Sequence, residues 1–286
     1  MTAISVPAIS APASALVDAM RRRLAVASVE GGLGVRCVAA GGGRVHLELP
    51  VLPSFVDGSP LGIRMLETAL AVLCDCGLGL ALMERRGDGD GGITLDLRVD
   101  LVGDVLPATR RLTLTAEALH VGEEHGAGRV EVYDDRGRLL AHAAGTMAIS
   151  ASLPFVDRDP LDQELRRLDL TTVFDGLEVD GAEACVPIRP ETENTRGIVH
   201  GALLAAGAVA VSRAAGDGGR LLSFGAEFLR PVPADIGALR ATVVPVRRGR
   251  RFVSDRVELL LPDGRAAASV TTVFARNRMT EALLNR

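Results

Sequence analysis

The chain has 286 residues, of which 48% are hydrophobic, and its formal net charge is −4. This length accommodates two domains of about 130–140 residues, each able to bury a core of its own. The basic residues are all arginine and are interspersed with acidic ones, which argues against nucleic acid as the main partner. Four cysteines without a C-x-x-C pair indicate neither a disulfide scaffold nor a zinc site, so free and mostly buried thiols are expected.

Targeting and membrane-spanning signals are not expected. Residues 1–14 lack both a basic region and a continuous apolar run, which argues against a signal peptide. The longest apolar stretch, Ala69–Met83, is interrupted by Asp75 and is too short to span a bilayer. The expectation is a soluble, cytoplasmic protein that does not enter a membrane.

In chain order, the predicted elements form two similar series. Each series begins with an amphipathic segment and a strand or two, continues into an apolar helix and ends in three or more strands. The helices are expected over 61–84 and 201–215, followed by Gly/Asp loops at 87–92 and 216–219. Because each helix is apolar nearly all round, a curved sheet is expected to wrap it, and the fold class is α+β.

An internal repeat supports this division. An offset of 127 residues places Gly137 on Gly264, and each glycine lies in the turn of a predicted hairpin. Further upstream the alignment places Thr94 on Ser223, with the longer first loop accounting for the change of offset. The predicted organisation is a flexible N-terminus (1–14), a first domain (15–151), a proline-containing linker (152–162), a second domain (163–278) and a tail (279–286).

The second half contains the segment ENTRGIVHGALLAAGAVA over 193–210. Asn194 is followed by a glycine three residues later and then by His200-Gly201, which opens an apolar helix. This spacing resembles the N-x-x-G-x-x-H-G-G pattern of the hotdog-fold acyl-CoA thioesterases of the phenylacetate-pathway and human thioesterase-superfamily type. The resemblance covers most of 168–276 and, more faintly, 16–151.

The resemblance implies two hotdog domains in tandem, each a curved antiparallel sheet around a long central helix, which form an intramolecular pseudo-dimer. In this family each active site spans the interface between two domains. One domain contributes the Asn and the first glycine of the helix, and its neighbour contributes an acid nine positions after the His equivalent. The implied reaction is hydrolysis of an acyl-CoA thioester to acid and CoA, without a metal or further cofactor. The pseudo-dimers are expected to pair into a homodimer.

The two halves lack complementary parts of this pattern. Nine residues after His200 stands Val209, so the second half has no acid. An offset of 134 places Asp75 of the first half at this position, with Leu66 and Pro60 at the His and Asn positions. One complete site, made from the acid of the first half and the Asn/His-Gly segment of the second, and one degenerate site are therefore expected.

Thioester hydrolysis suggests a role for each residue of this site. Gly201, at a helix N-terminus, presents an unpaired backbone N–H to the developing oxyanion, and Asn194 has an amide that donates to the carbonyl or holds the water. Asp75 serves as a nucleophile or as a general base, and these two roles stay open. Thr94 matches a Ser/Thr that the family places beside the acid. His200 is expected to act as a structural hydrogen-bond partner more than as a catalyst.

Each of these residues also has a structural interpretation. Asp75 fits a salt-bridged or capping residue, Asn194 a turn residue and Thr94 an ordinary strand residue. For the whole chain, the alternative is a non-catalytic acyl or acyl-CoA binder, which a filled cleft or an Asp75 facing the core would favour. A hotdog hydratase would need an Asp and a His five residues apart, which neither helix start provides.

Two groups of arginines are candidates for binding the phosphates of CoA. The predicted turn at 247–251 supplies Arg248, Arg250 and Arg251, and the corresponding turn of the first half is acidic. Arg230 is the second candidate. A solvated hairpin turn is the alternative interpretation of the first group.

Overall fold

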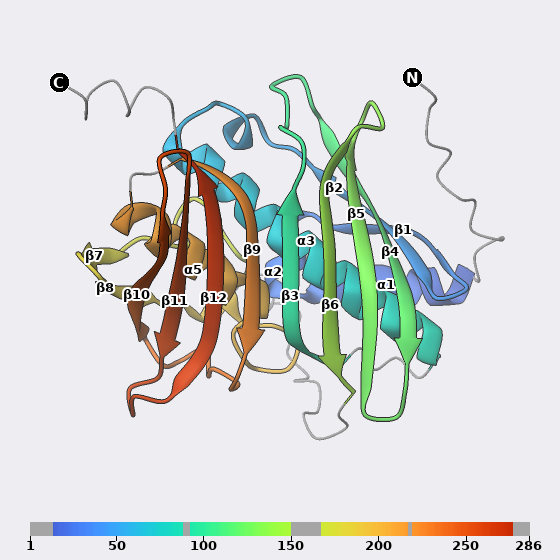
Figure 1. The fold of residues 1–286 in the computed structure, drawn as a ribbon. Helices are drawn as coiled ribbons and strands as arrows, with labels where there is room; N and C mark the ends of the chain where they lie inside the picture. The colour runs from blue at the N-terminus through green and yellow to red at the C-terminus, as the bar shows by residue number, and fades with distance from the viewer. Residues whose placement is uncertain (1–13, 88–91, 150–166, 217–218, 277–286) are drawn as a thin grey trace.

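The computed structural model describes residues 14–87, 92–149, 167–216 and 219–276 (Figure 1). The elements of the first half are α1 (Ser14–Val26), α2 (Ser28–Leu33), β1 (Arg36–Gly41), β2 (Arg44–Pro50), the 3-10 turn η1 (Pro53–Phe55), α3 (Pro60–Arg86), β3 (Ile93–Leu101), β4 (Arg111–Val121), β5 (His125–Asp134) and β6 (Leu139–Ala148). Those of the second half are β7 (Glu178–Asp180), β8 (Glu183–Pro187), the 3-10 turn η2 (Pro190–Thr192), α5 (Gly201–Ala215), β9 (Arg220–Phe228), β10 (Ala238–Arg248), β11 (Phe252–Leu260) and β12 (Ala266–Ala275). The predicted linker and tail lie outside the described residues.

One continuous sheet joins the two halves. Its strand order is β1-β2-β4-β5-β6-β3-β9-β12-β11-β10-β8-β7, so each half contributes six strands in corresponding positions. The halves meet where β3 pairs antiparallel with β9, with Leu97 opposite Ala226 and Val99 opposite Phe224. Both long helices lie on the same face of this sheet (Figure 1). The expected α+β fold, with an antiparallel sheet around a helix in each half, is confirmed.

Helix α3 begins and ends at residues suited to those positions. The Ser59 hydroxyl caps its start by accepting the backbone N–H of Gly62 at 2.9 Å, and Pro60 occupies the first helical position. At its end, Gly87 adopts φ +76°, a left-handed conformation that glycine reaches without strain. The helix therefore spans 27 residues, slightly more than the 61–84 expected from the sequence.

Burial explains why α3 is apolar on every side. Its length and mean hydropathy alone would allow it to cross a bilayer, because the helix extends beyond the apolar stretch Ala69–Met83 at both ends. However, 83% of its most apolar window is buried inside the protein, where strands and α5 surround it. A helix enclosed in this way has no solvated face on which polar residues are needed.

The structure corrects the alignment of Thr94. Each of the strands β3–β6 is followed 127 residues later by its counterpart among β9–β12. Thr94 pairs with Met147, and Leu221 pairs with Phe274 in the same way, so Leu221 and not Ser223 is the counterpart of Thr94. The difference in length lies before the strands, because Gly92 and Gly219 are also 127 residues apart and both have positive φ.

A buried polar cluster distinguishes the core of the second half. The Ser212 hydroxyl donates to Asp255 Oδ2 at 2.9 Å and lies 2.8 Å from the Thr272 hydroxyl. Arg248 Nη1 lies 2.5 Å from Asp255 Oδ1, with the geometry of an ion pair and not of an aligned hydrogen bond. In the first half Leu78 packs onto two glycines of β5 and β6 at the corresponding place. The core of the second half therefore contains a polar cluster at a place where the core of the first half is apolar.

Replacing Asp255 by alanine is expected to destabilise the chain by about 3 kcal/mol, because it removes the acceptor of the buried Ser212 hydroxyl and the carboxylate that pairs with Arg248. Urea denaturation of the wild type and the variant measures this difference. Asp263→Ala is the matched control, since Asp263 also pairs with an arginine but in an exposed turn. Equal losses in the two variants would contradict a role for the buried cluster.

Candidate active site

A cavity of about 390 Å³ lies between the two halves, at the start of β3 and the end of β9. Elements from both halves line it: α1, α2, α3, β3 and β6 from the first, and the segment before α5, α5 itself and the end of β9 from the second. Its apolar lining includes Leu24, Leu80, Met83, Met147, Leu204 and Phe228. The volume is within the range of small-molecule sites.

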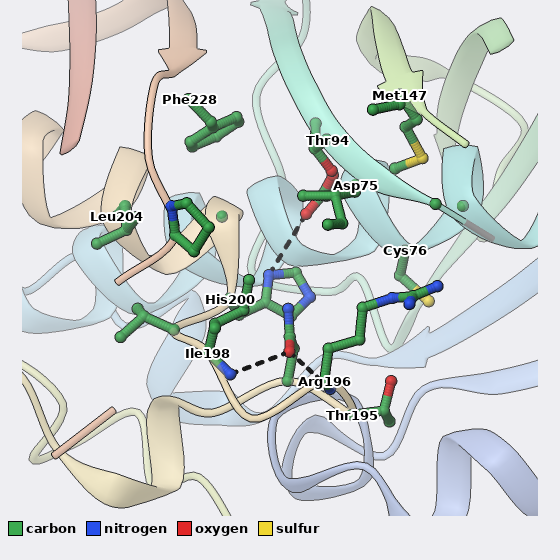
Figure 2. A pocket seen from close by; sticks show the side chains of 18 of the residues that line it. Asp75, Cys76, Thr94, Met147, Thr195, Arg196, Ile198, His200, Leu204 and Phe228 are labelled. Carbon is green, nitrogen blue, oxygen red and sulfur yellow. Dashed lines mark hydrogen bonds and ion pairs between the residues drawn. The ribbon is translucent and has the colours of Figure 1, made fainter. Parts of the chain in front are cut away.

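Asp75 projects from the middle of α3 into this cavity. Its carboxylate accepts a hydrogen bond from the Thr94 hydroxyl at 2.6 Å, and its other oxygen lies 3.4 Å from Nδ1 of His200. Figure 2 shows the three side chains directed toward one another, although they come from two different halves. The carboxylate is thus held at the interface, and Thr94 orients it as the resemblance implied.

Asn194 forms the turn that leads into α5. Its side-chain oxygen accepts the backbone N–H of Arg196 at 2.8 Å, while its backbone N–H bonds to the carbonyl of Ile198 at 2.7 Å. Gly197 closes the turn at φ +77°, which accounts for the glycine in the motif. Asn194 also lines the cavity, so it is a turn residue and a cavity residue at once.

His200 caps the N-terminus of α5. Its Nδ1 accepts the backbone N–H of Ala202 at 3.2 Å, and the Leu203 N–H bonds to the His200 carbonyl at 2.9 Å. Within the described chain, these bonds leave the N–H of Gly201 without an acceptor. Because Gly201 lines the cavity at the positive end of a helix, its N–H is available to an oxygen atom bound there.

Glu30 of α2 is a site residue that sequence reasoning missed. It lines the cavity, and its Oε1 lies 3.4 Å from Nε2 of His200. His200 therefore lies between two carboxylates, Asp75 and Glu30. The sequence contains one signal for it, because Glu30 is the only charged residue between Arg23 and Arg36.

Burial and proximity shift the pKa values of all three groups. Burial raises the pKa of Asp75 above its ordinary value, and His200 and Thr94 oppose this only in part. Burial disfavours the charged form of His200, but Glu30 and then Asp75 outweigh it and raise the pKa of the imidazole. Burial likewise disfavours the Glu30 charge, yet the contact with His200 leaves the pKa of Glu30 lowered. The charge states of the three groups are therefore coupled, and a proton can be shared among them.

The arginines of the cavity are not those expected from the basic turn. Arg23, Arg196 and Arg230 line it. The turn with Arg248, Arg250 and Arg251 lies at the opposite end of the sheet from the cavity. It precedes Phe252, which pairs with Ala275, and Ala275 pairs in turn with Arg220 at the start of β9. The cavity lies at the other end of β9, at Phe228. The prediction of these three turn residues at the site was wrong, because a hairpin turn and the repeat offset say nothing about which end of the sheet is open.

Among the residues that the structure describes, the corresponding position in the other half encloses only a very small space. Val209 and Leu221 lie together there, as Asp75 and Thr94 do at the first site, around a space of about 10 Å³. Pro60, at the Asn position, is already the first residue of α3, so a helix replaces the motif turn. These neighbours support the offset of 134 that placed Val209 opposite Asp75.

An ion pair occupies the place of the missing site. Glu67 stands at the position of Gly201, and its carboxylate pairs with the guanidinium of Arg213. The guanidinium carbon also lies 5.0 Å from the centre of the Phe274 ring, the counterpart of Met147. Substrate entry at this end would require separating a nearly buried ion pair, which is costly.

The remaining candidate groups offer no further chemistry at the site. All four cysteines are free; Cys37, Cys74 and Cys76 are buried and Cys185 is exposed. Burial raises the pKa of Cys37 to about 11 and that of Cys76 well above its ordinary value, so neither thiol ionises near neutral pH. Among the described residues, no group of three or more His, Cys, Asp or Glu side chains could hold a metal ion.

Comparison with known proteins agrees with this architecture. Residues 189–275 match the family described as acyl-CoA thioesterase N-terminal domain, although they form the second half of this chain. They contain the turn, His200-Gly201, α5 and the four strands that follow. No curated protein matches the chain in sequence.

Solved structures share the fold over most of the chain. The tesB protein of Mycobacterium avium subsp. paratuberculosis is 15% identical, with a TM-score of 0.57 over 86% of this chain and 97% of its own. A protein of unknown function with a hot dog fold from Alicyclobacillus acidocaldarius is 19% identical, with a TM-score of 0.50 over 84% and 95% of the two chains. At these identities the likeness concerns the fold alone.

Proposed function

We propose, from the premise that this chain is a thioester hydrolase of the hotdog fold, that it hydrolyses an acyl-CoA at one composite site between its two halves. The observation that carries the proposal is the contact of Asp75, from α3, with His200, which caps α5, at the wall of a cavity of about 390 Å³. The acid and the helix N-terminus thus come from different halves, as the complementary losses in the sequence require.

The geometry supports a separate role for each of Gly201, Asp75 and Thr94 in thioester hydrolysis. With the thioester carbonyl oxygen at the N–H of Gly201, the helix N-terminus stabilises the negative charge that develops on this oxygen. Asp75 then either attacks the carbonyl carbon or removes a proton from an attacking water. Attack by Asp75 expels the CoA thiolate and leaves an acyl–Asp75 anhydride, which a water molecule then hydrolyses to the free acid. Attack by the activated water instead breaks the C–S bond directly, so both routes consume one water and release CoA and the free acid. Thr94 keeps the carboxylate facing the carbon by donating to its other oxygen.

The cavity also supports the proposed substrate class. Its lining is mainly apolar beyond the catalytic cluster, which suits an acyl chain. The binding-only alternative called for a filled cleft or for an acid turned into the core, and the open cavity with Asp75 in its wall favours hydrolysis instead. Pairing of two chains into a homodimer stays a prediction, which the mass of the native protein in solution tests.

Release of free CoA from a series of acyl-CoA thioesters of increasing chain length is the direct test. Hydrolysis of at least one chain length, lost in the Asp75→Asn variant, is expected. Binding of acyl-CoA without turnover by the wild-type protein, measured by calorimetry, would support the binding-only alternative instead. Val209→Ala serves as the control for the degenerate site and is expected to leave turnover unchanged.

Arg230 is proposed to bind the phosphates of CoA, because it is exposed where it lines the cavity. Replacing it by alanine is expected to raise KM by about three- to tenfold while kcat stays constant, since the lost contact is a charge-assisted hydrogen bond outside the reacting centre. Steady-state kinetics measure both constants. Arg250→Ala, an equal loss of charge at the opposite end of the sheet, is the matched control, and an equal rise in KM there would contradict the assignment.

A further inference from the structure

The carboxylate of Glu30 is buried at the cavity and has no part in the mechanism so far. One oxygen faces Nε2 of His200 at 3.4 Å, and the other has no hydrogen-bond partner among the described residues. A carboxylate brought into such surroundings loses its hydration and is costly unless a specific contact compensates it. The contact with His200 contributes most to this compensation, and the Glu30 backbone N–H and the charge of Arg23 add to it.

The hydrogen bonds around His200 determine where its protons can be. In the neutral imidazole, Nδ1 is unprotonated because it accepts the N–H of Ala202, so the ring proton is on Nε2 and faces Glu30. Asp75 lies 3.4 Å from the same Nδ1. A lone pair on Nδ1 disfavours an ionised Asp75 beside it, whereas a proton on Nδ1 favours one.

We propose that Glu30 is a positioning residue of this site: by accepting the Nε2–H of His200, it turns Nδ1 toward Asp75 and makes the imidazole basic enough to take the proton of Asp75. The transfer breaks the O–H bond at Asp75 and forms an N–H bond at Nδ1. The N–H of Ala202 can then no longer donate to Nδ1, and it donates instead to the carboxylate of Asp75, with which it also interacts. The transfer leaves an ionised Asp75 beside an imidazolium that lies between two carboxylates. The inference rests on the proposed function, because ionised Asp75 is the form that can act as nucleophile or base.

Several other charged or titratable groups face this cluster. Arg23 of α1 and Arg196 of the motif turn line the cavity, and Cys76 of α3 is a neutral buried thiol beside it. Among the charged neighbours, His200 lowers the pKa of Asp75 by more than Glu30 raises it directly. The effect of Glu30 through His200 is therefore expected to exceed its direct repulsion of Asp75, and the two effects have opposite signs.

Glu30→Gln separates these effects, because glutamine keeps an oxygen that accepts the Nε2–H but loses the charge. The acid limb of the kcat/KM profile, which reports ionisation of Asp75, is expected to move to higher pH by about 1 unit in this variant. KM is expected to stay constant. A shift to lower pH would mean that Glu30 acts on Asp75 only as a nearby negative charge, and an unchanged limb would mean that its role is merely structural. Either result overturns the proposal.

A second measurement does not depend on catalysis. Nitrogen NMR of the wild-type protein, with the His200 signals assigned by their loss in His200→Asn, is expected to show a proton on Nε2 and an imidazole that titrates above the ordinary range of histidine. The absence of a proton on Nε2 would overturn the proposed role of Glu30 even if the protein hydrolyses thioesters. Conversely, a protonated Nε2 in a protein that hydrolyses no thioester would refute the proposed function alone.

The control for the charge change is Glu123→Gln. This variant removes the same charge from an exposed turn between β4 and β5, and it is expected to leave both the acid limb and the His200 titration unchanged. If it moved the limb as far as Glu30→Gln does, the effect would be one of net charge and not of the contact with His200.

Discussion

Asp75→Asn is expected to lower kcat for acyl-CoA hydrolysis by about 10³-fold or more, because it removes the carboxylate proposed to act as nucleophile or general base. The replacement is nearly isosteric. Its amide oxygen can still accept from Thr94, and its NH₂ can donate to Nδ1 of His200, so the geometry of the site is preserved. Single-turnover assays at saturating substrate separate this loss from any change in binding.

The same variant is expected to be at least as stable as the wild type at neutral pH. The pKa of Asp75 is raised in the folded chain, so its favourable contribution is full below the unfolded pKa and is lost as pH rises through the folded pKa. At neutral pH the ionised carboxylate therefore costs stability that asparagine does not. A lower free energy of unfolding for the variant, measured in urea at pH 7, would indicate a structural role and would weaken the catalytic assignment.

Gly201→Pro is expected to lower kcat by about 10²–10³-fold, because proline removes the backbone N–H that faces the developing oxyanion. The substitution suits the helix: Gly201 is the first residue of α5, where proline is common, and His200 has the extended conformation (φ −61°, ψ 127°) that a residue before proline requires. Helix α5 is therefore expected to persist. Circular dichroism and substrate affinity verify that folding and binding are retained.

Gly201→Ala is the matched control for this variant. A Cβ atom at this position would lie 3.2 Å from the Phe228 ring, so both variants crowd the ring, but alanine keeps the N–H. A loss that is much smaller in the alanine variant is expected. Equal losses in both variants would assign the effect to crowding at Phe228 and would remove Gly201 from the proposed mechanism.

The repeat in the sequence determined much of the fold. The apolar runs predicted both long helices, and the 127-residue offset is the spacing of the corresponding strands in the sheet. Complementary loss of the acid and of the His-Gly element pointed to one composite site before any contact was known. The inferences about the helices and the repeat hold because periodicity and motif spacing are local properties, which a chain carries regardless of how its halves pack, whereas the composite site stays a proposal.

Two expectations failed where strand register or sheet geometry decides the outcome. Thr94 was aligned two residues away from its structural counterpart, because the lengths of the preceding loops differ and sequence similarity at short strands does not define register. The prediction that the turn arginines bind CoA rests on their charge and on the acidic turn at the corresponding place in the first half, and neither property indicates which end of the sheet is open. Which end of a strand lies at the open cavity depends on the pairing of β3 with β9, a contact between distant segments.

The sequence by itself thus determined that two similar α+β halves exist and that Asp75 and His200-Gly201 belong together. Only the tertiary structure decided what surrounds them. It brought Glu30 from α2 against His200, and it filled the second site with the pair of Glu67 and Arg213. The physical reason is that the charge state of a buried group depends on neighbours in space, and neither pair has a sequence spacing that would reveal it.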